Sequence, residues 1–413
     1  MYIISLMSKK KSIAVLISGG KASYIVASLL KKQGHNVKAV YIELTKPEHP
    51  LYNLLNSLNF VTNTKSEDLK TLYSKQGIPF FGIDASSEYE QLILNSIISA
   101  RIAGESYEYD ISTCKLLLDI INSRLSKLKC DYIALGMFAK VLKNNNTGDY
   151  EIYKSNDLIN DQSFLLSKIS QNILSKLILP CGDLKLTEVD KLYNQISGEI
   201  IITKKKLNLF DLYKKDEFRI FLSNYIPNSL KQDGQLVIHK EEQIVKDHED
   251  HTQFYLGQDK IQLPNINIDK DLVVYNIKVV NGEISLIKKN DIKIRQILLE
   301  NIFIYPSQVK TKPIKVYLRF RDNSHCLATL YFKSNQKSLI VLDEESSVLL
   351  LRNERVHLYN NIGSGSKLIC AGDISTYGYL ENETLVLLPK TKTKLREEAL
   401  REDDENEYIS YEF

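Results

Sequence analysis

A serine and two glycines at the end of an apolar run are the first residues that could do chemistry. Ser18, Gly19 and Gly20 follow the run "AVLI", and a helical pattern then continues to Gly34. Two adjacent glycines let backbone N–H groups approach a phosphate without hindrance from side chains. The N-terminus of the following helix adds positive potential. The pattern therefore predicts a phosphate-binding turn, with an ordinary tight strand-to-helix turn as the alternative.

Two residues at the start of that helix bear on the prediction. Lys21 could supply a positive charge to a phosphate, or it could simply be solvated. Ala22 brings no polar group to the turn. Any binding of phosphate here would therefore depend on the backbone and on Lys21.

The elements that must position the turn alternate between strand and helix in the first half of the chain. A sheet built this way is mostly parallel and covered on both faces, and its ligands bind at the carboxyl ends of the strands, where Ser18–Gly20 falls. Helices are expected over residues 66–77, with Ser66 as N-cap and Gly77 as stop, and over 91–103 and 115–128. The expected strands are 12–17, 37–43, 79–83, 131–135 and 199–203.

The second half of the chain is dominated by β-strand patterns. Residues 207–263 are irregular and charged, and two alternating apolar runs then flank Asn281-Gly282, which predicts a β-hairpin. Short strands recur beyond it, as in a small barrel. We expect a sheet domain at 1–206, a small central domain at 207–265, a β-barrel at 266–390 and a charged tail at 391–413.

Composition excludes several classes of protein. No apolar run approaches the roughly 20 residues that span a bilayer. The five cysteines show no paired spacing, which favours a reduced, cytoplasmic protein over a disulfide framework. The net charge of +3 does not by itself indicate a nucleic-acid partner, although it could conceal a basic face. In "KDHEDH", residues 246–251, a third metal ligand at a fixed spacing is missing, so we interpret it as a solvated loop and expect no metal site.

Motifs spread along nearly the whole chain carry a resemblance to one family. In chain order they are "SGGKASY", "KQGIPFFGIDASSEY", "AGESYEYDISTCK", "KCDYIALGMFAK", "INDQSFLL", "ILPCGDLKLTEV", "EFRIFLSNYIP" and "HTQFYLGQDKI". Together they resemble the tRNA-specific 2-thiouridylases, which belong to the PP-loop ATP pyrophosphatase class. "DYIALG" and "DQSFLL" are the most specific of these matches.

The resemblance implies a fold and an activity. The fold is α/β: a PP-loop (adenine nucleotide alpha hydrolase-like) parallel sheet domain, a small central domain and a C-terminal β-barrel. The activity uses ATP and Mg²⁺ to adenylate the wobble uridine of tRNA, after which a cysteine persulfide delivers sulfur. The implied partners are tRNA and, for an active protein, an external sulfur-carrier protein; neither a membrane nor DNA is expected.

The resemblance also assigns roles to individual residues. Cys114 matches the cysteine that assists sulfur release, although one residue is inserted before it, and its alternative role is a small apolar residue at a helix start. The residues expected to bind ATP are Ser18, Gly19, Gly20, Lys21, Ser23 and Gly136. Those expected to contact RNA are Asp161, Gln162, Ser163, Lys204, Lys205, Lys206 and Gln258.

Four positions depart from the family pattern. Ala22 replaces the aspartate of the turn, and Met137 replaces a histidine. The position of the persulfide cysteine falls on Asp211, which cannot carry sulfur, and Asp259 replaces an arginine beside Gln258. Three hypotheses remain: a divergent thiouridylase supplied with sulfur by another protein, a catalytically silent relative that binds tRNA or other RNA, and an enzyme that adenylates a different substrate.

Overall fold

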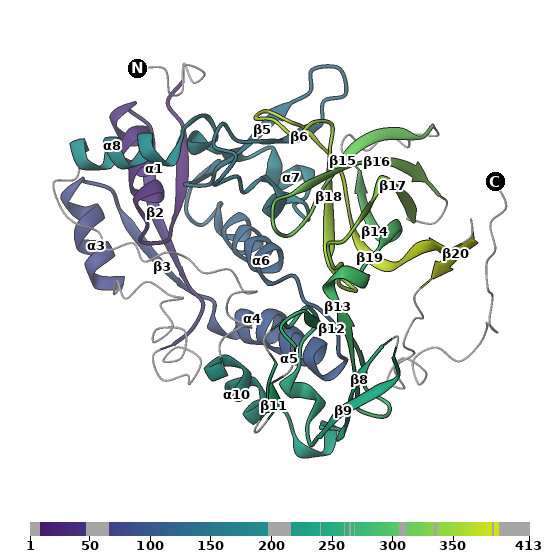
Figure 1. Ribbon diagram of the computed structural model, residues 1–413. Coiled ribbons are helices and arrows are strands. Elements are labelled where there is room, and N and C mark those ends of the chain that lie inside the picture. Colours follow the sequence, from purple (N-terminus) through teal and green to yellow (C-terminus); the bar gives the residue numbers. More distant parts are fainter. Residues whose placement is uncertain are drawn as a thin grey trace, which may run out of the picture.

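The computed structural model describes residues 9–46, 66–196, 216–239, 241–259, 261–263, 266–267, 269–304, 312–333, 337–381 and 384–387. Within these ranges the strands form a parallel sheet, a four-stranded sheet, a closed barrel and two small two-stranded sheets. The parallel sheet and its helices lie on the left of Figure 1, the barrel on the right and the four-stranded sheet below. Within these ranges no helix has the length and apolar character to cross a membrane.

The first sheet is parallel throughout, in the order β3-β2-β1-β4-β7. Its central strand, β1, reads SIAVLI and is largely buried, as expected of a strand covered on both faces. The predicted sheet is confirmed, and four predicted strands match to within one residue at each end; residues 199–203 lie outside the described ranges. The strands are β1 (Ser12–Ile17), β2 (Asn36–Glu43), β3 (Phe80–Asp84), β4 (Tyr132–Leu135) and β7 (Leu177–Ile178).

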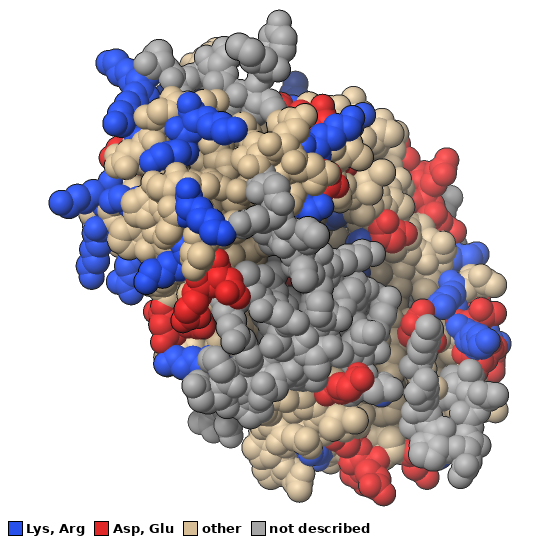
Figure 2. All heavy atoms as spheres, turned by 90° about the vertical axis from the view of Figure 1, so that its left-hand side faces the viewer, with Lys and Arg blue, Asp and Glu red and all other residues tan. Residues whose placement is uncertain are grey.

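Helices cover both faces of this sheet. On one face α1 (Lys21–Lys32), α3 (Ser66–Lys75) and α8 (Leu186–Ile196) pack through buried apolar side chains, and Gly77 with φ +65° follows α3 as predicted. Figure 2 shows the side of the molecule that these helices occupy, and Lys and Arg side chains gather over its upper part. The small net charge therefore conceals an uneven charge distribution.

The helices on the other face begin earlier than the sequence predicts. A continuous helical run comprises α4 (Ser86–Tyr89), the π-helical turn η1 (Glu90–Leu94) and α5 (Asn95–Ile102). Helix α6 (Tyr109–Arg124) starts at Tyr109 rather than at residue 115. The early start follows from burial, because Ile111 and Cys114 are both buried and lie on one side of a helix. Cys114 is thus inside a helix and not at its start, which corrects that part of the prediction.

A hairpin and three short helical turns link α6 to α8. The hairpin of β5 (Ala139–Lys143) and β6 (Tyr150–Lys154) reaches the barrel, where the Lys154 N–H donates to the Ser366 carbonyl over 2.8 Å. The turns are η2 (Ser163–Leu166), α7 (Gln171–Leu174) and η3 (Pro180–Asp183). This hairpin is therefore one of the contacts between the sheet domain and the barrel.

The four-stranded sheet has the order β12-β13-β8-β9. The predicted hairpin at Asn281-Gly282 is confirmed, and Gly282 adopts φ +67°. The hairpin joins β8 and not the barrel, so this sheet takes strands from both sides of residue 265. Its strands are β8 (Gly234–Ile238), β9 (Gln243–His248), β12 (Leu272–Lys278) and β13 (Glu283–Lys288). The other elements of the central region are the two-stranded sheet of β10 (Gln262–Leu263) and β11 (Ile266–Asn267), helix α10 (Asp216–Tyr225), and the short turns η4 (Asn228–Leu230), η5 (His251–Gln253) and η6 (Lys289–Asp291).

The segment "KDHEDH" is not the solvated loop that was predicted. Its first half completes β9, and Asp250 caps η5 by accepting from the Thr252 N–H over 2.8 Å. His251 is buried: its Nδ1 accepts from the Gln232 N–H, and its Nε2 lies 3.0 Å from the Ile102 carbonyl. The histidine therefore joins the central region to α5. No cluster of three metal-binding side chains occurs within the described ranges.

The predicted barrel is confirmed as six antiparallel strands in the order β14-β17-β16-β15-β18-β19, closed by pairing of β14 with β19. Alternate residues fill its interior, among them Val316, Leu318 and Leu358. β20 extends the end of β19. The strands are β14 (Ile294–Ile304), β15 (Ile314–Arg319), β16 (His325–Phe332), β17 (Ser338–Ser346), β18 (Arg355–Tyr359), β19 (Leu368–Glu381) and β20 (Thr384–Leu387).

Candidate active site

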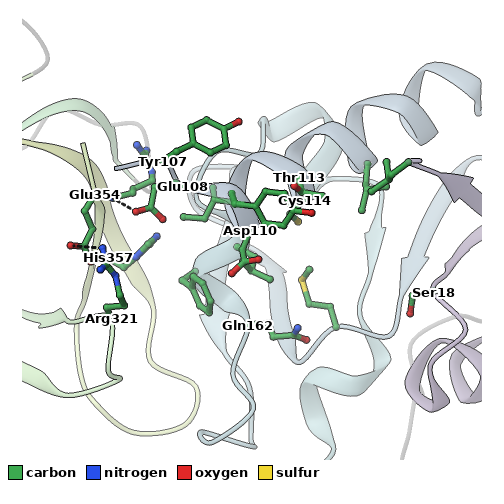
Figure 3. Close-up of a pocket in the computed structure, with 18 of the residues that line it drawn as sticks. Ser18, Tyr107, Glu108, Asp110, Thr113, Cys114, Gln162, Arg321, Glu354 and His357 are labelled. Carbon is green, nitrogen blue, oxygen red and sulfur yellow. Dashed lines mark hydrogen bonds and ion pairs between the residues drawn. The ribbon is translucent and has the colours of Figure 1, made fainter. Parts of the chain in front are cut away.

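One pocket connects the glycine turn to the wall of the barrel. It encloses about 800 Å³ and is lined by residues of the parallel sheet, of α6, of the central region and of the barrel. Figure 3 shows Ser18 at one end and Arg321 with Glu354 at the other, while Asp110, Cys114 and Gln162 lie between them. A pocket of this size can hold a nucleotide-sized ligand.

The glycine turn has the backbone of an anion site. Gly19 adopts φ +73°, which favours glycine, and Gly20 is the N-cap of α1. The Ser23 hydroxyl donates to the Gly20 carbonyl over 2.9 Å, so its side chain stabilises the turn from within. No acidic residue occupies the first turn of α1. The N-terminal N–H groups of the helix and its dipole therefore favour a bound phosphate.

Gly136, at the end of β4, packs directly against this turn. A Cβ atom at this position would lie 2.5 Å from the Ser23 nitrogen and 2.8 Å from the Ala22 Cβ. Both distances are shorter than van der Waals contact. Gly136 therefore acts by allowing α1 to approach the sheet, which sets the position of the glycine turn.

Lys21 is directed toward α8. Its Nζ lies 2.7 Å from Asp190 Oδ1 and 5.6 Å from the centre of the Tyr193 ring. Lys21 is also absent from the lining of the pocket. Its charge is already paired, which argues against the phosphate contact considered from the sequence.

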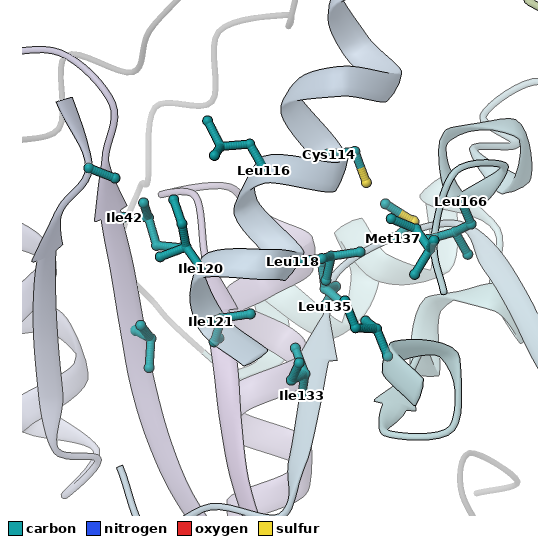
Figure 4. Close-up of a cluster of buried hydrophobic side chains, with 14 of the residues drawn as sticks. Ile42, Cys114, Leu116, Leu118, Ile120, Ile121, Ile133, Leu135, Met137 and Leu166 are labelled. Atoms are coloured by element: carbon teal, nitrogen blue, oxygen red, sulfur yellow. The ribbon is translucent and has the colours of Figure 1, made fainter. Parts of the chain in front are cut away.

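Cys114 lies midway along the pocket, on the first turns of α6. It is 8% exposed, and its side chain points toward Met137 and Leu166 (Figure 4). Asp110 lines the pocket one helical turn earlier, because residues four apart share a helix face. The residue inserted before Cys114 therefore still leaves the carboxylate and the thiol on one side of the helix.

The segment Asp161–Ser163 makes its contacts mainly within the protein. Asp161 accepts from the Ser155 N–H over 2.8 Å and from the Ser163 hydroxyl over 2.7 Å, and burial raises the pKa of its carboxyl. Gln162 Oε1 accepts from the Phe138 N–H, although Gln162 still lines the pocket. Ser163 is fully buried. Asp161 and Gln162 remain accessible to a ligand, whereas Ser163 stabilises the loop.

Other residues proposed to contact RNA are placed differently. Gln258 is only 2% exposed, and its Oε1 accepts from the Tyr255 N–H over 3.2 Å. It stabilises a turn of the central region, and its burial argues against direct contact with RNA. Lys204, Lys205, Lys206 and Asp211 lie outside the described residues.

The cysteines are all present as thiols. Cys114 lines the pocket, and the other four do not. Cys130, Cys181 and Cys370 are buried, and Cys326 is half-buried on β16. Burial raises the pKa of the Cys181 thiol to about 12, which disfavours a reactive thiolate at that position.

The start of α6 is held by the barrel. Glu105 accepts from the Asn353 side-chain amide over 2.7 Å, and Glu108 accepts from the Arg355 N–H over 3.2 Å. Asn353 lies in the turn before β18, and Arg355 is the first residue of that strand. The helix that carries Cys114 therefore takes its position partly from the barrel, through contacts that no local pattern in the sequence indicates.

Two carboxyl groups meet at this contact. Glu354 Oε2 lies 3.0 Å from the Arg321 guanidinium. The pKa of Glu108 is raised to about 7, mainly by burial and to a smaller extent by the nearby Glu354 carboxylate. The positive charges of Arg321 and Lys168 oppose this rise. Glu108 is therefore protonated over much of the range below neutral pH, when it no longer repels Glu354.

We expect Glu108→Gln to stabilise the protein at pH 8 and to change little at pH 5. The folded-state pKa is raised above its unfolded value, so the stability linked to the protonated form is present at low pH and is lost as pH rises through about 7. Glutamine imitates that form at every pH. Thermal unfolding at both pH values should show a few degrees of gain at pH 8 only. Glu345→Gln, on an exposed position of β17, is the control, and an equal gain at both pH values would contradict the prediction.

Some pocket residues were missed by sequence reasoning. Asp110 could have been identified from the sequence, because it stands four residues before Cys114 and therefore lies on the same face of a helix. Arg319 and Arg321 stand two apart at the end of a strand in "YLRFRD", which is the spacing of one sheet face. Glu108 and His357 carried no local signal. The structure brings the side chains of all five to the same pocket.

Comparisons with known proteins find similar proteins by sequence and by structure. A family model described as the tRNA methyl transferase HUP domain matches residues 11–212. The tRNA-specific 2-thiouridylase MnmA of Ureaplasma urealyticum is 26% identical over 383 residues, which cover 87% of this chain and 96% of that protein. A solved structure titled as a predicted subunit of tRNA methyltransferase from Methanocaldococcus jannaschii has 18% identity and a TM-score of 0.28, over 52% of this chain and 88% of that one.

A second curated relative shows the family. The tRNA-specific 2-thiouridylase MnmA of Mesoplasma florum is 30% identical over 257 residues, which cover 61% of this chain and 68% of that protein. The glycine turn, the cysteine of α6 and the closed C-terminal barrel keep the order that the resemblance implies. The chain belongs to the family of tRNA-specific 2-thiouridylases.

Proposed function

We propose that this protein transfers sulfur to the wobble uridine of tRNA and uses ATP to activate that uridine. The observation that carries the proposal is that one pocket is lined both by the glycine turn and by Cys114. In the reaction the uridine O2 attacks the α-phosphate, pyrophosphate leaves, and sulfur then displaces AMP from the carbon. One purified reaction tests this: with uridine-containing tRNA and a persulfide-bearing carrier both present, AMP and pyrophosphate should form in equal amounts, and neither should form without the tRNA.

ATP fits the residues at the glycine end of the pocket. The N-terminus of α1 offers N–H groups and carries no competing acid. Gly136 allows α1 to approach the sheet closely, which sets the position of those N–H groups. Mg²⁺ fits less well, since Ala22 stands where the family has a carboxylate and the described ranges contain no metal-binding cluster. We therefore assign no step to a protein-bound metal ion.

Sulfur would come from an external carrier protein that bears a persulfide. Asp211 occupies the position of the family's persulfide cysteine and cannot carry sulfur. The terminal sulfur of the carrier persulfide attacks the activated carbon and AMP leaves. The Cys114 thiolate then attacks the inner sulfur, which releases 2-thiouridine and leaves a disulfide between Cys114 and the carrier. A thiol reductant must reduce that disulfide before the next turnover.

A second function, binding of tRNA without catalysis, is favoured by two apolar replacements. Ala22 and Met137 line the pocket where the family has an aspartate and a histidine. Each removes a polar group next to the reacting atoms. In this case tRNA would bind, and no AMP would form in the same reaction. A search of the source genome for an intact thiouridylase would also separate the two functions.

We expect weak binding of Mg-ATP, with a dissociation constant on the order of 1 mM. Ala22→Asp restores a carboxylate at the first turn of α1 and should tighten Mg-ATP at least about tenfold, but should not tighten ATP in EDTA. Lys21→Ala should leave both affinities unchanged, because Lys21 is paired with Asp190 outside the pocket. Isothermal titration calorimetry measures all three proteins. Micromolar binding by the unaltered protein would contradict the expectation, and a large loss in Lys21→Ala would restore a role for that lysine.

A further inference from the structure

Arg319 has a fixed orientation at the barrel end of the pocket. It is the last residue of β15, and its guanidinium carbon lies 4.1 Å from the centre of the Phe164 ring. Phe164 in turn packs edge-on against His357, with ring centres 5.7 Å apart. Stacking on an aromatic face holds the plane of the guanidinium and leaves its N–H edge available.

The charge of Arg319 is not neutralised by an ion pair. Neighbouring Arg321 pairs with Glu354, and Arg355 pairs with Asp373 over 2.6 Å. Within the described part of the chain, no carboxylate oxygen lies within 4.0 Å of a nitrogen of Arg319. Its hydrogen bond goes to the neutral side-chain oxygen of Asn323. Since a guanidinium has five N–H donors, most of them remain for a ligand.

The Asp161 carboxylate is near enough for the charge of Arg319 to oppose the rise of its pKa, but among the described residues the two side chains form no hydrogen bond or ion pair. Both oxygens of the Asp161 carboxylate already accept hydrogen bonds, from the Ser155 N–H and from the Ser163 hydroxyl. Burial and the nearby positive charges of Arg319 and Arg355 hold the pKa of His357 well below its usual value. The imidazole is therefore neutral, and Arg319 contributes a positive charge on this wall that has no ion pair among the described residues.

We propose that Arg319 binds a backbone phosphate of the RNA, next to the nucleotide that enters the pocket. The inference rests on the proposed function, because it takes the ligand to be tRNA. Arginine binds phosphate through two parallel hydrogen bonds, and a guanidinium fixed by stacking loses little freedom on binding. The glycine turn at the opposite end serves the phosphates of ATP. The two phosphate sites proposed here, at the glycine turn and at Arg319, thus belong to the same pocket as Cys114.

A salt series with unmodified tRNA tests the contact. Arg319→Gln should weaken binding about 5- to 20-fold and reduce the slope of log affinity against log salt by about 0.7 to 0.9, as expected for one lost phosphate contact. Arg319→Lys keeps the charge and should have an intermediate affinity. Lys315→Gln is the control: it removes one charge from the same outer face of β15, where Lys315 pairs with Asp343 over 2.7 Å. Its affinity and slope should match those of the unaltered protein.

Neutral phosphates in the RNA identify the partner. In an anticodon stem-loop, a methylphosphonate beside the wobble uridine should weaken binding to the unaltered protein about 5- to 20-fold and should not weaken binding to Arg319→Gln further. If no single methylphosphonate weakens binding to the unaltered protein, or if the losses in the two proteins are equal, the inference is wrong. That result leaves the proposed function intact. If the unaltered protein binds no tRNA at any salt concentration, the proposed function fails and this inference fails with it.

Discussion

Replacing Cys114 with serine is expected to remove 2-thiouridine from tRNA in cells where this variant is the only copy of the protein. Cys114 lines the pocket, whereas Cys130, Cys181, Cys326 and Cys370 do not. A serine hydroxyl is not ionised at neutral pH and cannot attack the sulfur of a carrier persulfide. Mass spectrometry of digested tRNA should show a decrease of at least about a hundredfold, since removal of a nucleophile abolishes its step.

A second cysteine variant separates loss of chemistry from loss of fold. Cys326→Ser changes a half-buried thiol on the barrel strand β16, outside the pocket, and should leave thiolation unchanged. Cys114→Ser should still bind tRNA with unaltered affinity and should still release pyrophosphate from ATP, because adenylation precedes the thiol step. Undiminished 2-thiouridine in Cys114→Ser would exclude Cys114 from the mechanism. If 2-thiouridine is absent also in cells that carry the unaltered protein, the result favours the second function, binding of tRNA without catalysis.

Replacing Gly136 with alanine is expected to cause the largest loss of stability among single methyl additions to the pocket wall. The new Cβ would lie 2.5 Å from the Ser23 nitrogen and 2.6 Å from the Ala22 carbonyl carbon, so the backbone at the start of α1 must move. Overpacking against rigid backbone costs about 1–3 kcal/mol, and more where the neighbour cannot shift. Thermal unfolding should show the loss, and any binding of ATP at the glycine turn should weaken with it.

Gly82→Ala is the matched control for this change. Gly82 lies on the parallel strand β3, and a Cβ there would meet only the Phe80 ring, at 3.9 Å. That distance is an ordinary contact, so alanine should be neutral or slightly stabilising because it restricts the unfolded chain. If Gly136→Ala were as stable as Gly82→Ala, then α1 would not depend on this close approach. The position of the glycine turn would then need another explanation.

Much of the framework was predictable because it depends on local patterns. The apolar runs at 12–17 and 131–135 identified buried strands, and Gly77 ended a helix at a positive φ. Asn281-Gly282 identified the β12–β13 hairpin for the same reason, since its turn requires a positive φ. The start of α6 was predicted too late, because tertiary burial of Ile111 and Cys114 extended the helix beyond its local signals.

The amino-acid sequence by itself determined the fold class, the glycine turn and the family. Each is recognisable from short motifs and apolar runs, which do not depend on contacts with distant parts of the chain. Only the tertiary structure decided which charges face the pocket. Lys21 pairs with Asp190, while Arg319 stacks on Phe164 and carries no ion pair within the described residues. Such pairs join segments far apart in the sequence. Their formation depends on how sheet, helices and barrel pack together, and packing is a property of the whole folded chain.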